Sequence, residues 1–147
     1  VTAKKLETMP NLTITDGAYI TSQDVFDVVK AFTDKYNINL TFVGYDPSRY
    51  ESLKSLIDTY FFDVDNERQL SIRQGFALSD YIKLLKDKLH DKTLIHNSSL
   101  LQWSLLNFAV RIGTSGDLMA KKMTDDEKID PVVAVVNALK VSVIKGI

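Results

Sequence analysis

Two aspartates share a local sequence pattern that could support chemistry. Asp46 and Asp130 each have an apolar lead-in, which is a run of residues before Asp46 and Ile129 alone before Asp130. Each precedes a proline and leads into a segment with helical spacing. Carboxylate oxygens are hard ligands, and two or three of them converging on one point bind Mg²⁺ or Mn²⁺. Two such ions can clamp the attacking and leaving oxygens of a phosphodiester. The pattern therefore makes Asp46 and Asp130 candidate metal ligands.

The same pattern also has a purely structural interpretation. Aspartate is a favoured N-cap of helices, and proline is favoured at the first helical position. Because caps are common and catalytic carboxylates are rare, the pattern alone favours capping at both positions. The two interpretations are compatible, since one oxygen of a carboxylate can cap a helix while the other binds a metal ion.

The other residue types with chemical potential offer weaker patterns. The sequence contains no cysteine, which excludes a disulfide, a thiolate zinc site and a cysteine nucleophile. His90 and His96 lack the spacing of a zinc motif, and we expect them at a helix end and in a loop. No glycine-rich phosphate-binding loop is present. Arg73, Lys121 and Lys122 are the better candidates for contacts with DNA phosphates, because they are expected near strand ends and a hairpin.

The strand before Asp46 is the element that positions this residue. Residues 39–45 are apolar and aromatic, which is typical of a buried strand, and Pro47 cannot continue the ladder. Asp46 is therefore expected at the carboxyl end of the strand, where chemistry gathers in open α/β sheets. Asp130 is expected at the start of an apolar helix over 132–144.

Further strands and helices are expected along the chain. Strands are expected over 12–15, before a turn at Asp16-Gly17, and over 70–73. A loop is expected over 61–68 and a hairpin over 107–123. The expected helices begin at Thr21, after Pro47, at Ser79 and near Ser98. The buried face of the first helix is predicted to contain Val25, Val28, Val29, Phe32 and Tyr36. Alternating strands and helices predict an α/β sheet with parallel neighbours and right-handed crossovers.

Length and composition limit the classes of protein to which the chain can belong. A chain of 147 residues with 45% hydrophobic and 25% charged residues is typical of one globular domain. The net charge of -1 argues against a freestanding basic nucleic-acid binder, although a local basic patch remains compatible with it. No apolar stretch is long enough to span a bilayer and no signal peptide is evident, so no membrane partner is expected. The chain does not begin with methionine, and we expect it to be a fragment.

Four motifs, in order, resemble those of one family. Residues 42–50 (FVGYDPSRY) are similar to the "GYDP" strand end of the nuclease domain in the large terminase subunit of tailed bacteriophages. Residues 72–79 (IRQGFALS) resemble its "RQGF…LS" segment, and 94–107 resemble its "H…P.L.W…N" stretch, with Asn97-Ser98 in place of the usual Asn-Pro. Residues 128–134 (KIDPVVA) resemble its "RIDxxxA" helix start. Each motif is weak alone, whereas the ordered set is fairly specific.

This resemblance implies a ribonuclease-H-like fold with a mixed sheet flanked by helices. It implies a Mg²⁺- or Mn²⁺-dependent endonuclease, with two metal ions in the complete domain, that cuts concatemeric viral DNA during genome packaging. The implied partners are double-stranded viral DNA, the portal and the small terminase subunit. The implied location is the bacterial host cytoplasm, at the procapsid portal.

The family uses three metal-binding carboxylates, and this sequence matches two of them. By motif, Asp46 corresponds to the second and Asp130 to the third. Nothing matches the earlier strand that carries the first, and Asp16 is expected in a turn after what corresponds to the family's third strand. We therefore expect residues 1–147 to be one partial carboxyl-terminal nuclease domain, without the ATPase domain or the first catalytic strand. The isolated chain is expected to be weakly active or inactive.

Two other functions remain open from the sequence. The first is another ribonuclease-H-like nuclease, such as a resolvase or transposase, which would not be expected to carry the segments around Gln74 and Trp103. The second is a non-catalytic module that grips DNA or docks within the packaging motor, in which Asp46 and Asp130 only cap helices. A separation of about 4–7 Å between the two carboxylates would favour a shared metal site.

Overall fold

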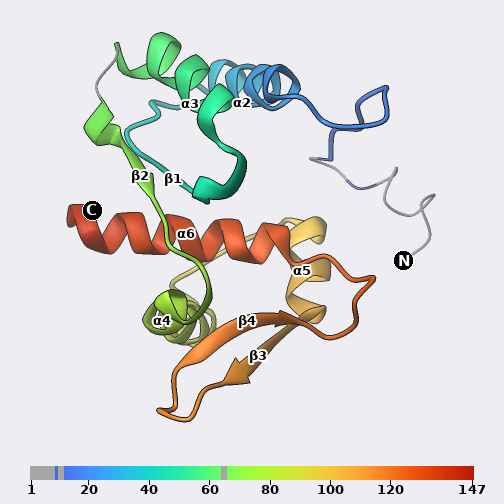
Figure 1. Cartoon of the computed structure of the whole chain (residues 1–147), viewed down its shortest axis with the longest axis vertical. Helices are drawn as coiled ribbons and strands as arrows, with labels where there is room; N and C mark the ends of the chain where they lie inside the picture. Colours follow the sequence, from blue (N-terminus) through green and yellow to red (C-terminus); the bar gives the residue numbers. More distant parts are fainter. Residues whose placement is uncertain (1–8, 10–11, 64–65) are drawn as a thin grey trace. The chain divides into compact units, whose positions relative to one another are not determined.

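The computed structural model describes residues 9, 12–63 and 66–147 (Figure 1). The chain forms two compact units, an amino-terminal unit of Thr13–Ile72 and a carboxyl-terminal unit made mainly of Arg73–Ile147. Each unit has its own helices and its own pair of strands. Within the described residues, no helix combines the length and the apolar character needed to cross a membrane.

The amino-terminal unit consists of two parallel strands with helices packed against them. Strand β1 (Val43–Tyr45) pairs with β2 (Gln69–Ser71), with Gly44 opposite Leu70. The predicted parallel neighbours are therefore confirmed, although β1 is shorter than the expected strand over 39–45. The helical elements are α2 (Ser22–Tyr36), the 3₁₀ turn η1 (Pro47–Arg49), α3 (Glu51–Ile57), the π-helical turn η2 (Asp58–Phe62) and the 3₁₀ turn η3 (Asn66–Arg68).

Helix α2 begins where the sequence predicts, at a complete capping box. The Thr21 hydroxyl accepts the backbone N–H of Asp24 at 3.1 Å, and the Asp24 carboxylate accepts the N–H of Thr21 at 2.8 Å. The hydrogen bond from the Thr21 hydroxyl lowers the pKa of Asp24, and the bond from the Thr21 backbone adds to this effect. The helix ends at Asn37, which adopts a left-handed conformation with φ of 51°.

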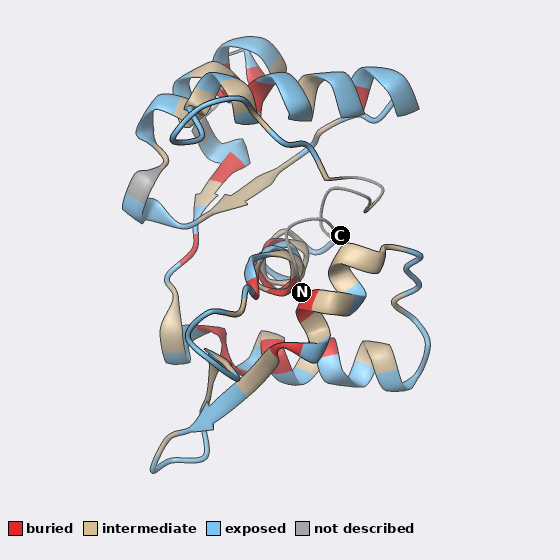
Figure 2. Cartoon of the chain, turned by 90° about the vertical axis from the view of Figure 1, so that its right-hand side faces the viewer, coloured by how far each residue is buried: buried red, intermediate tan, exposed pale blue. Residues whose placement is uncertain are grey.

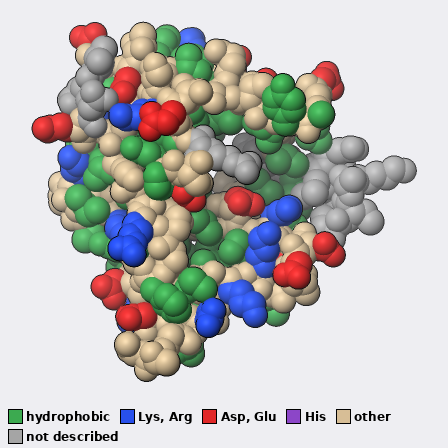
Figure 3. Space-filling view, in the orientation of Figure 1, with side chains coloured by type: hydrophobic (Ala, Val, Ile, Leu, Met, Phe, Trp, Pro, Cys, Tyr) green, Lys and Arg blue, Asp and Glu red, His purple; other side chains and the backbone are tan. Residues whose placement is uncertain are grey.

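The buried face of α2 differs from the prediction. Phe26 and Thr33 are buried and Val29 packs against the core, whereas Val25, Val28, Phe32 and Tyr36 are 37–52% exposed. The Phe26 ring lies edge-on to Tyr60 and Phe61 of η2, and the core of the unit consists of Phe26, Ile57 and Phe62. Both sides of the helix have apolar residues at helical spacing, and packing against η2 selects the side with Phe26. Exposed residues are frequent on the helices of this unit (Figure 2), and hydrophobic side chains reach the surface near α2 (Figure 3).

Two other predictions for this unit are wrong. Residues 12–15 form no strand, and bends follow over 16–19. The expected loop over 61–68 begins instead with the last residues of η2, where Phe62 is only 3% exposed. Because Phe62 is buried in the core and the half-buried Phe61 packs against it, this segment is part of the helical layer rather than a loop.

The carboxyl-terminal unit packs three helices around a small core and adds a hairpin. Its helical elements are the 3₁₀ turn η4 (Gly75–Leu78), α4 (Ser79–His90), α5 (Ser99–Leu106) and α6 (Asp130–Lys145). Strands β3 (Phe108–Ile112) and β4 (Leu118–Lys122) form an antiparallel pair, which confirms the predicted hairpin. The predicted final helix is also confirmed, and it packs against both α4 and α5. The core of this unit consists of Leu78, Ile82, Leu85, Ile129, Val132, Val136 and Val141.

Two serines at helix starts have different roles in this unit. Ser98 caps α5 as predicted, since its hydroxyl accepts the N–H of Leu101 at 3.2 Å. Ser79 is the first residue of α4 rather than its cap, so this prediction is wrong. The buried Ser79 hydroxyl instead accepts the N–H of Leu118 at 2.9 Å and connects α4 to β4. The predicted α/β class is confirmed, with one parallel and one antiparallel pair of strands in the described residues.

Candidate metal and DNA site

Asp46 lies directly after β1, at the carboxyl end of the strand as the sequence predicts. Its Oδ1 atom accepts the backbone N–H of Ser48 at 3.0 Å, and Pro47 is the first residue of η1. Asp46 is therefore an N-cap, which confirms the structural interpretation for this residue. The side chain is exposed, and no described residue donates a hydrogen bond to its Oδ2 atom. The capping bond leaves that second oxygen available as a ligand.

A buried polar network supports the turn that follows Asp46. The rings of Tyr45 and Tyr50 are stacked with centroids 4.0 Å apart, and the Tyr50 hydroxyl donates to Gln69 Oε1 at 2.7 Å. The Gln69 amide in turn donates to the carbonyl of Lys54 and to the carboxylate of Asp58. Burial raises the pKa of Tyr50, and the nearby charge of Asp58 adds to this effect. Tyr50 therefore keeps its proton and remains a donor near neutral pH.

Asp130 is placed differently from Asp46. Helix α6 begins at Asp130 itself, with Ile129 at the N-cap position and no side-chain cap bond. The N–H of Val132 donates instead to the hydroxyl of Ser104, a fully buried residue of α5, at 3.3 Å. The interpretation of Asp130 as a cap is therefore wrong. Its carboxylate is exposed and makes no hydrogen bond or ion pair with any described residue.

The two histidines lie where the sequence predicts. His90 is the last residue of α4, and its Nδ1 atom lies 2.8 Å from the carboxylate of Asp91. His96 is exposed in the segment between α4 and α5. Neither position indicates a catalytic or metal-binding role.

The three candidate DNA-contact residues all lie in the carboxyl-terminal unit. Arg73 and Lys121 are exposed, Lys122 is half-buried, and none of them forms an ion pair with a described residue. Lys121 and Lys122 are adjacent in β4, so their side chains point to opposite faces of the hairpin. Figure 3 shows lysine and arginine side chains over the region of β4.

Sequence reasoning missed Arg111 of β3. Ala109 pairs with Lys121 and Arg111 pairs with Met119, so Arg111 and Lys121 share one face of the hairpin. The hairpin register contains this information, but the register could not be fixed from the sequence alone.

The comparisons with known proteins agree with the motifs. The family model described as "Terminase large subunit, endonuclease domain" matches residues 2–145. This chain belongs to that family. Two proteins named "Terminase large subunit", from Lactococcus phage p2 and Lactococcus phage SK1, are each 49% identical to it over 132 residues. The matches cover 90% of this chain and 24% of each relative, so the chain spans about a quarter of their length. No solved structure matches the chain.

Each terminase motif occupies a defined place in the structure. The "GYDP" residues form the end of β1 and the start of η1, and the "RQGF" residues lead into η4. The tryptophan motif covers the segment before α5 and the helix itself, and the "RID" counterpart (Lys128-Ile129-Asp130) leads into α6. The recognition of the terminase nuclease family from these motifs is confirmed. The prediction of one partial nuclease domain over residues 1–147 stays a prediction.

No group of three or more acidic, histidine or cysteine side chains in the described residues is arranged to hold a metal ion. Asp46 belongs to the amino-terminal unit and Asp130 to the carboxyl-terminal unit of this terminase domain. Convergence of their carboxylates therefore stays a prediction. Each unit contributes one of the two candidate carboxylates, and each of these has at least one oxygen without a hydrogen bond to a described residue.

Proposed function

We propose that this chain is the DNA-cutting part of a phage packaging motor. In this proposal it acts as a metal-dependent endonuclease that cuts concatemeric double-stranded viral DNA into genome lengths. The portal and the small terminase subunit are its partners, in the host cytoplasm at the procapsid portal. The match to the terminase endonuclease family over almost the whole chain and the names of its relatives support this proposal.

The assignment of Asp130 as a metal ligand rests on its carboxylate, which makes no hydrogen bond or ion pair with any described residue. An aspartate at the start of a helix normally gains stability by capping, yet Ser104 supplies the hydrogen-bond acceptor for the N–H of Val132. Asp130 is exposed and has no hydrogen-bond partner among the described residues. In this proposal, a metal ion outside the chain binds this carboxylate.

Asp46 and Asp130 fit the requirements of hard divalent cations, because both offer carboxylate oxygens that the fold leaves accessible. Asp46 would bind the metal ion through Oδ2, while Oδ1 continues to accept the N–H of Ser48, which orients the carboxylate. When bound, Mg²⁺ or Mn²⁺ activates a water molecule and stabilises the charge that develops on the phosphodiester. Arg73, Lys121 and Lys122 contribute contacts to the DNA phosphates in this proposal.

A second candidate function is a non-catalytic module that grips DNA. It is favoured by the capping bond of Asp46, which gives this carboxylate a structural role. In this alternative the exposed cations bind the DNA backbone and the two aspartates bind no metal.

Matched substitutions in a terminase large subunit that contains this domain distinguish the two functions. Asp46→Asn keeps the capping oxygen and removes the charge, and Asp130→Asn removes a charge that no described residue uses. Each is expected to reduce Mn²⁺-dependent plasmid cleavage at least about 100-fold, the loss typical when one electrostatic stabiliser leaves an active site. Asp16→Asn is the control, because Asp16 is an exposed aspartate that does not follow a strand. This variant should cut normally.

Circular dichroism checks that each variant is folded. Near-normal cutting by Asp46→Asn or Asp130→Asn would contradict the metal-ligand assignment of that residue. Normal DNA binding by every variant, with no metal-dependent cutting by the unaltered subunit, would support the gripping module instead. The isolated chain of 147 residues is expected to cut weakly or not at all in the same assay.

A further inference from the structure

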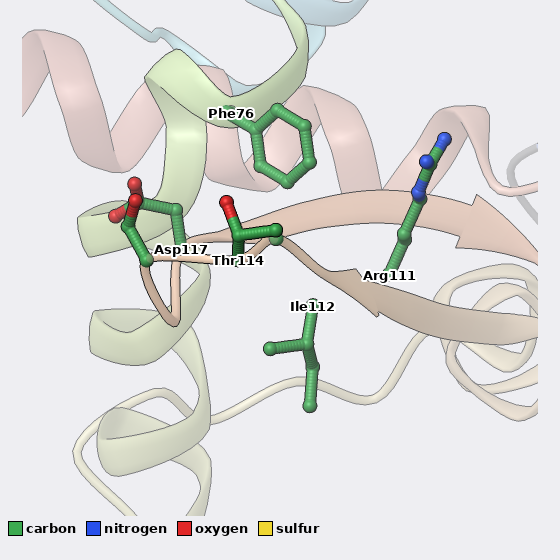
Figure 4. A pocket seen from close by; sticks show the side chains of 7 residues that line it. Phe76, Arg111, Ile112, Thr114 and Asp117 are labelled. Atoms are coloured by element: carbon green, nitrogen blue, oxygen red, sulfur yellow. The ribbon is translucent and has the colours of Figure 1, made fainter.

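A pocket of about 350 Å³ lies between η4 and the tip of the β3–β4 hairpin (Figure 4). All of its lining residues belong to the carboxyl-terminal unit, and neither Asp46 nor Asp130 is among them. The lining of the pocket therefore includes neither of the residues proposed to bind metal. The residues that give it chemical character are Phe76, Arg111, Thr114 and Asp117.

Both walls of the pocket are fixed by local contacts. At Gly113, an added Cβ atom would lie 3.1 Å from an edge carbon of the Phe76 ring, so the absence of a side chain lets the ring approach the turn. The turn is closed by the N–H of Gly113, which donates to the carbonyl of Asp117 at 2.8 Å. The bond from the N–H of Leu118 to the Ser79 hydroxyl anchors the start of β4 to α4. The pocket is therefore part of the folded unit rather than a gap beside a loose loop.

The side chains around the pocket combine three kinds of chemistry. Phe76 is 41% exposed, so part of an aromatic side chain is open to solvent. Figure 4 shows Arg111, Thr114 and Asp117 on the same side of the hairpin as this ring, whereas Ile112 points to the other side. Arg111 is exposed and forms no ion pair with any residue in the described part of the chain.

These groups match the parts of a single nucleotide. An exposed aromatic ring stacks on a base whatever its identity. A guanidinium binds phosphate oxygens through two parallel hydrogen bonds. A carboxylate and a hydroxyl accept hydrogen bonds from the exocyclic amino group of a base. A duplex keeps its bases stacked inside, so only a nucleotide that has left the stack can offer all three features.

We propose that this pocket binds one unstacked nucleotide of a DNA strand, with its base on Phe76 and its phosphate at Arg111. The proposal rests on the proposed function only in that DNA is the substrate of the domain. It adds a site that holds a single-stranded segment or a frayed end of that DNA. A free nucleotide has the same chemistry, so the test includes both sources.

The test measures binding by the 147-residue chain in the presence of EDTA, so that no metal-dependent cleavage occurs. The probes are a fluorescent single-stranded oligonucleotide, a blunt duplex of the same length and deoxyadenosine monophosphate as a competitor. Phe76→Leu is expected to weaken binding of the single strand by roughly 10-fold, the scale of one base–aromatic stack. Binding of the duplex should change by less than about twofold, since its bases are not available for stacking.

Three further variants make the result specific. Phe32→Leu replaces a ring of similar exposure in α2 and should leave binding unchanged. Phe76→Tyr retains the ring and should retain the affinity. Gly113→Ala is expected to displace the Phe76 ring and weaken single-strand binding by roughly threefold, less than the loss of the whole stack. Since φ of Gly113 is not in the left-handed region, alanine introduces no backbone strain there. Phe76→Tyr and Gly113→Ala still decide the proposal if Phe76→Leu fails to fold.

The outcomes separate this proposal from the cleavage proposal. Three results would overturn the nucleotide pocket. Phe76→Leu could reduce the affinity for single strand and duplex equally, Phe76→Leu and Phe32→Leu could reduce the affinity for the single strand equally, or the single strand could fail to bind. If deoxyadenosine monophosphate binds with the same affinity as the oligonucleotide, the ligand is a free nucleotide. That result would overturn the assignment to a DNA strand. A Phe76-dependent affinity without metal-dependent cutting in the large subunit would contradict the proposed nuclease function alone.

Discussion

The helical segments that begin at the two Asp-Pro sequences of this chain obtain acceptors for their first N–H groups in different ways. At Asp46 the carboxylate caps its own turn through the N–H of Ser48. At Asp130 the carboxylate makes no such bond, and the hydroxyl of Ser104 from α5 accepts the N–H of Val132. One cap is supplied by the segment itself and the other by a neighbouring helix.

This difference shows that the role of a helix-start aspartate depends on what the surrounding elements provide. The turn after β1 is exposed, so the nearest acceptor for its N–H groups is the side chain at its own start. The start of α6 is packed against α5, where Val132 and Ser104 are both fully buried. A buried donor needs a partner in the protein, and Ser104 supplies it. Asp130 is therefore not needed as a cap.

The largest expected effect on folding comes from removing the borrowed cap. Ser104→Ala leaves the buried N–H of Val132 without an acceptor and should reduce the free energy of unfolding by about 1–3 kcal/mol. The matched control is Ser99→Ala in the same helix, because the Ser99 hydroxyl is buried without a hydrogen-bond partner in the described chain. That substitution should change the free energy by no more than about 0.5 kcal/mol, or stabilise the protein.

Urea denaturation followed by circular dichroism measures both serine variants. Equal losses for the two would mean that the Val132 bond contributes nothing and that α6 is capped in another way.

A smaller effect is expected for the self-supplied cap. Asp46→Ala removes the acceptor for the N–H of Ser48 and should cost about 1 kcal/mol, whereas Asp46→Asn retains an acceptor oxygen and should cost only about 0.3 kcal/mol. The same denaturation curves give both values. If asparagine were as costly as alanine, the charge of Asp46 rather than its capping bond would support the turn.

Among the alanine substitutions at Ser104, Asp46 and Asp130, the smallest effect is expected at Asp130. Asp130→Ala removes no hydrogen bond to a described residue and loses only the interaction of a negative charge with the first turn of α6, which is worth about 0.5 kcal/mol at an exposed position. Addition of 0.5 M NaCl should reduce even this difference, because exposed charges are screened by salt. A cost above that of Ser104→Ala would show that Asp130 has a structural partner and would weaken its assignment as a free ligand.

The sequence was sufficient where structure is decided by neighbouring residues. The capping box of Thr21 and Asp24, the Ser98 cap and the β3–β4 hairpin all depend on residues within a few positions of one another. The position of Asp46 at a strand end also follows from a local rule, because Pro47 stops the ladder. Each family motif is equally local, and the order of the motifs along the chain was enough to recognise the terminase nuclease family.

The sequence was insufficient where a distant element makes the decision. Helix α2 has apolar residues on two sides, and the rings of η2 select Phe26 over Phe32 for burial. The sequence around Ser79 is typical of a helix cap, yet its hydroxyl accepts the N–H of Leu118, 39 positions away. The free carboxylate of Asp130 depends in the same way on Ser104, which no local pattern connects to α6.

The bond between Leu118 and Ser79 has a consequence for how the hairpin can be followed in solution. The N–H of Leu118 is the first of β4, and it donates to the buried Ser79 hydroxyl of helix α4. Exchange of that hydrogen with deuterated water requires the hairpin to leave α4, even when the ladder between β3 and β4 stays intact. A single amide thus reports the lifetime of the docked hairpin, and with it the lifetime of the wall that the hairpin gives to the Phe76 pocket.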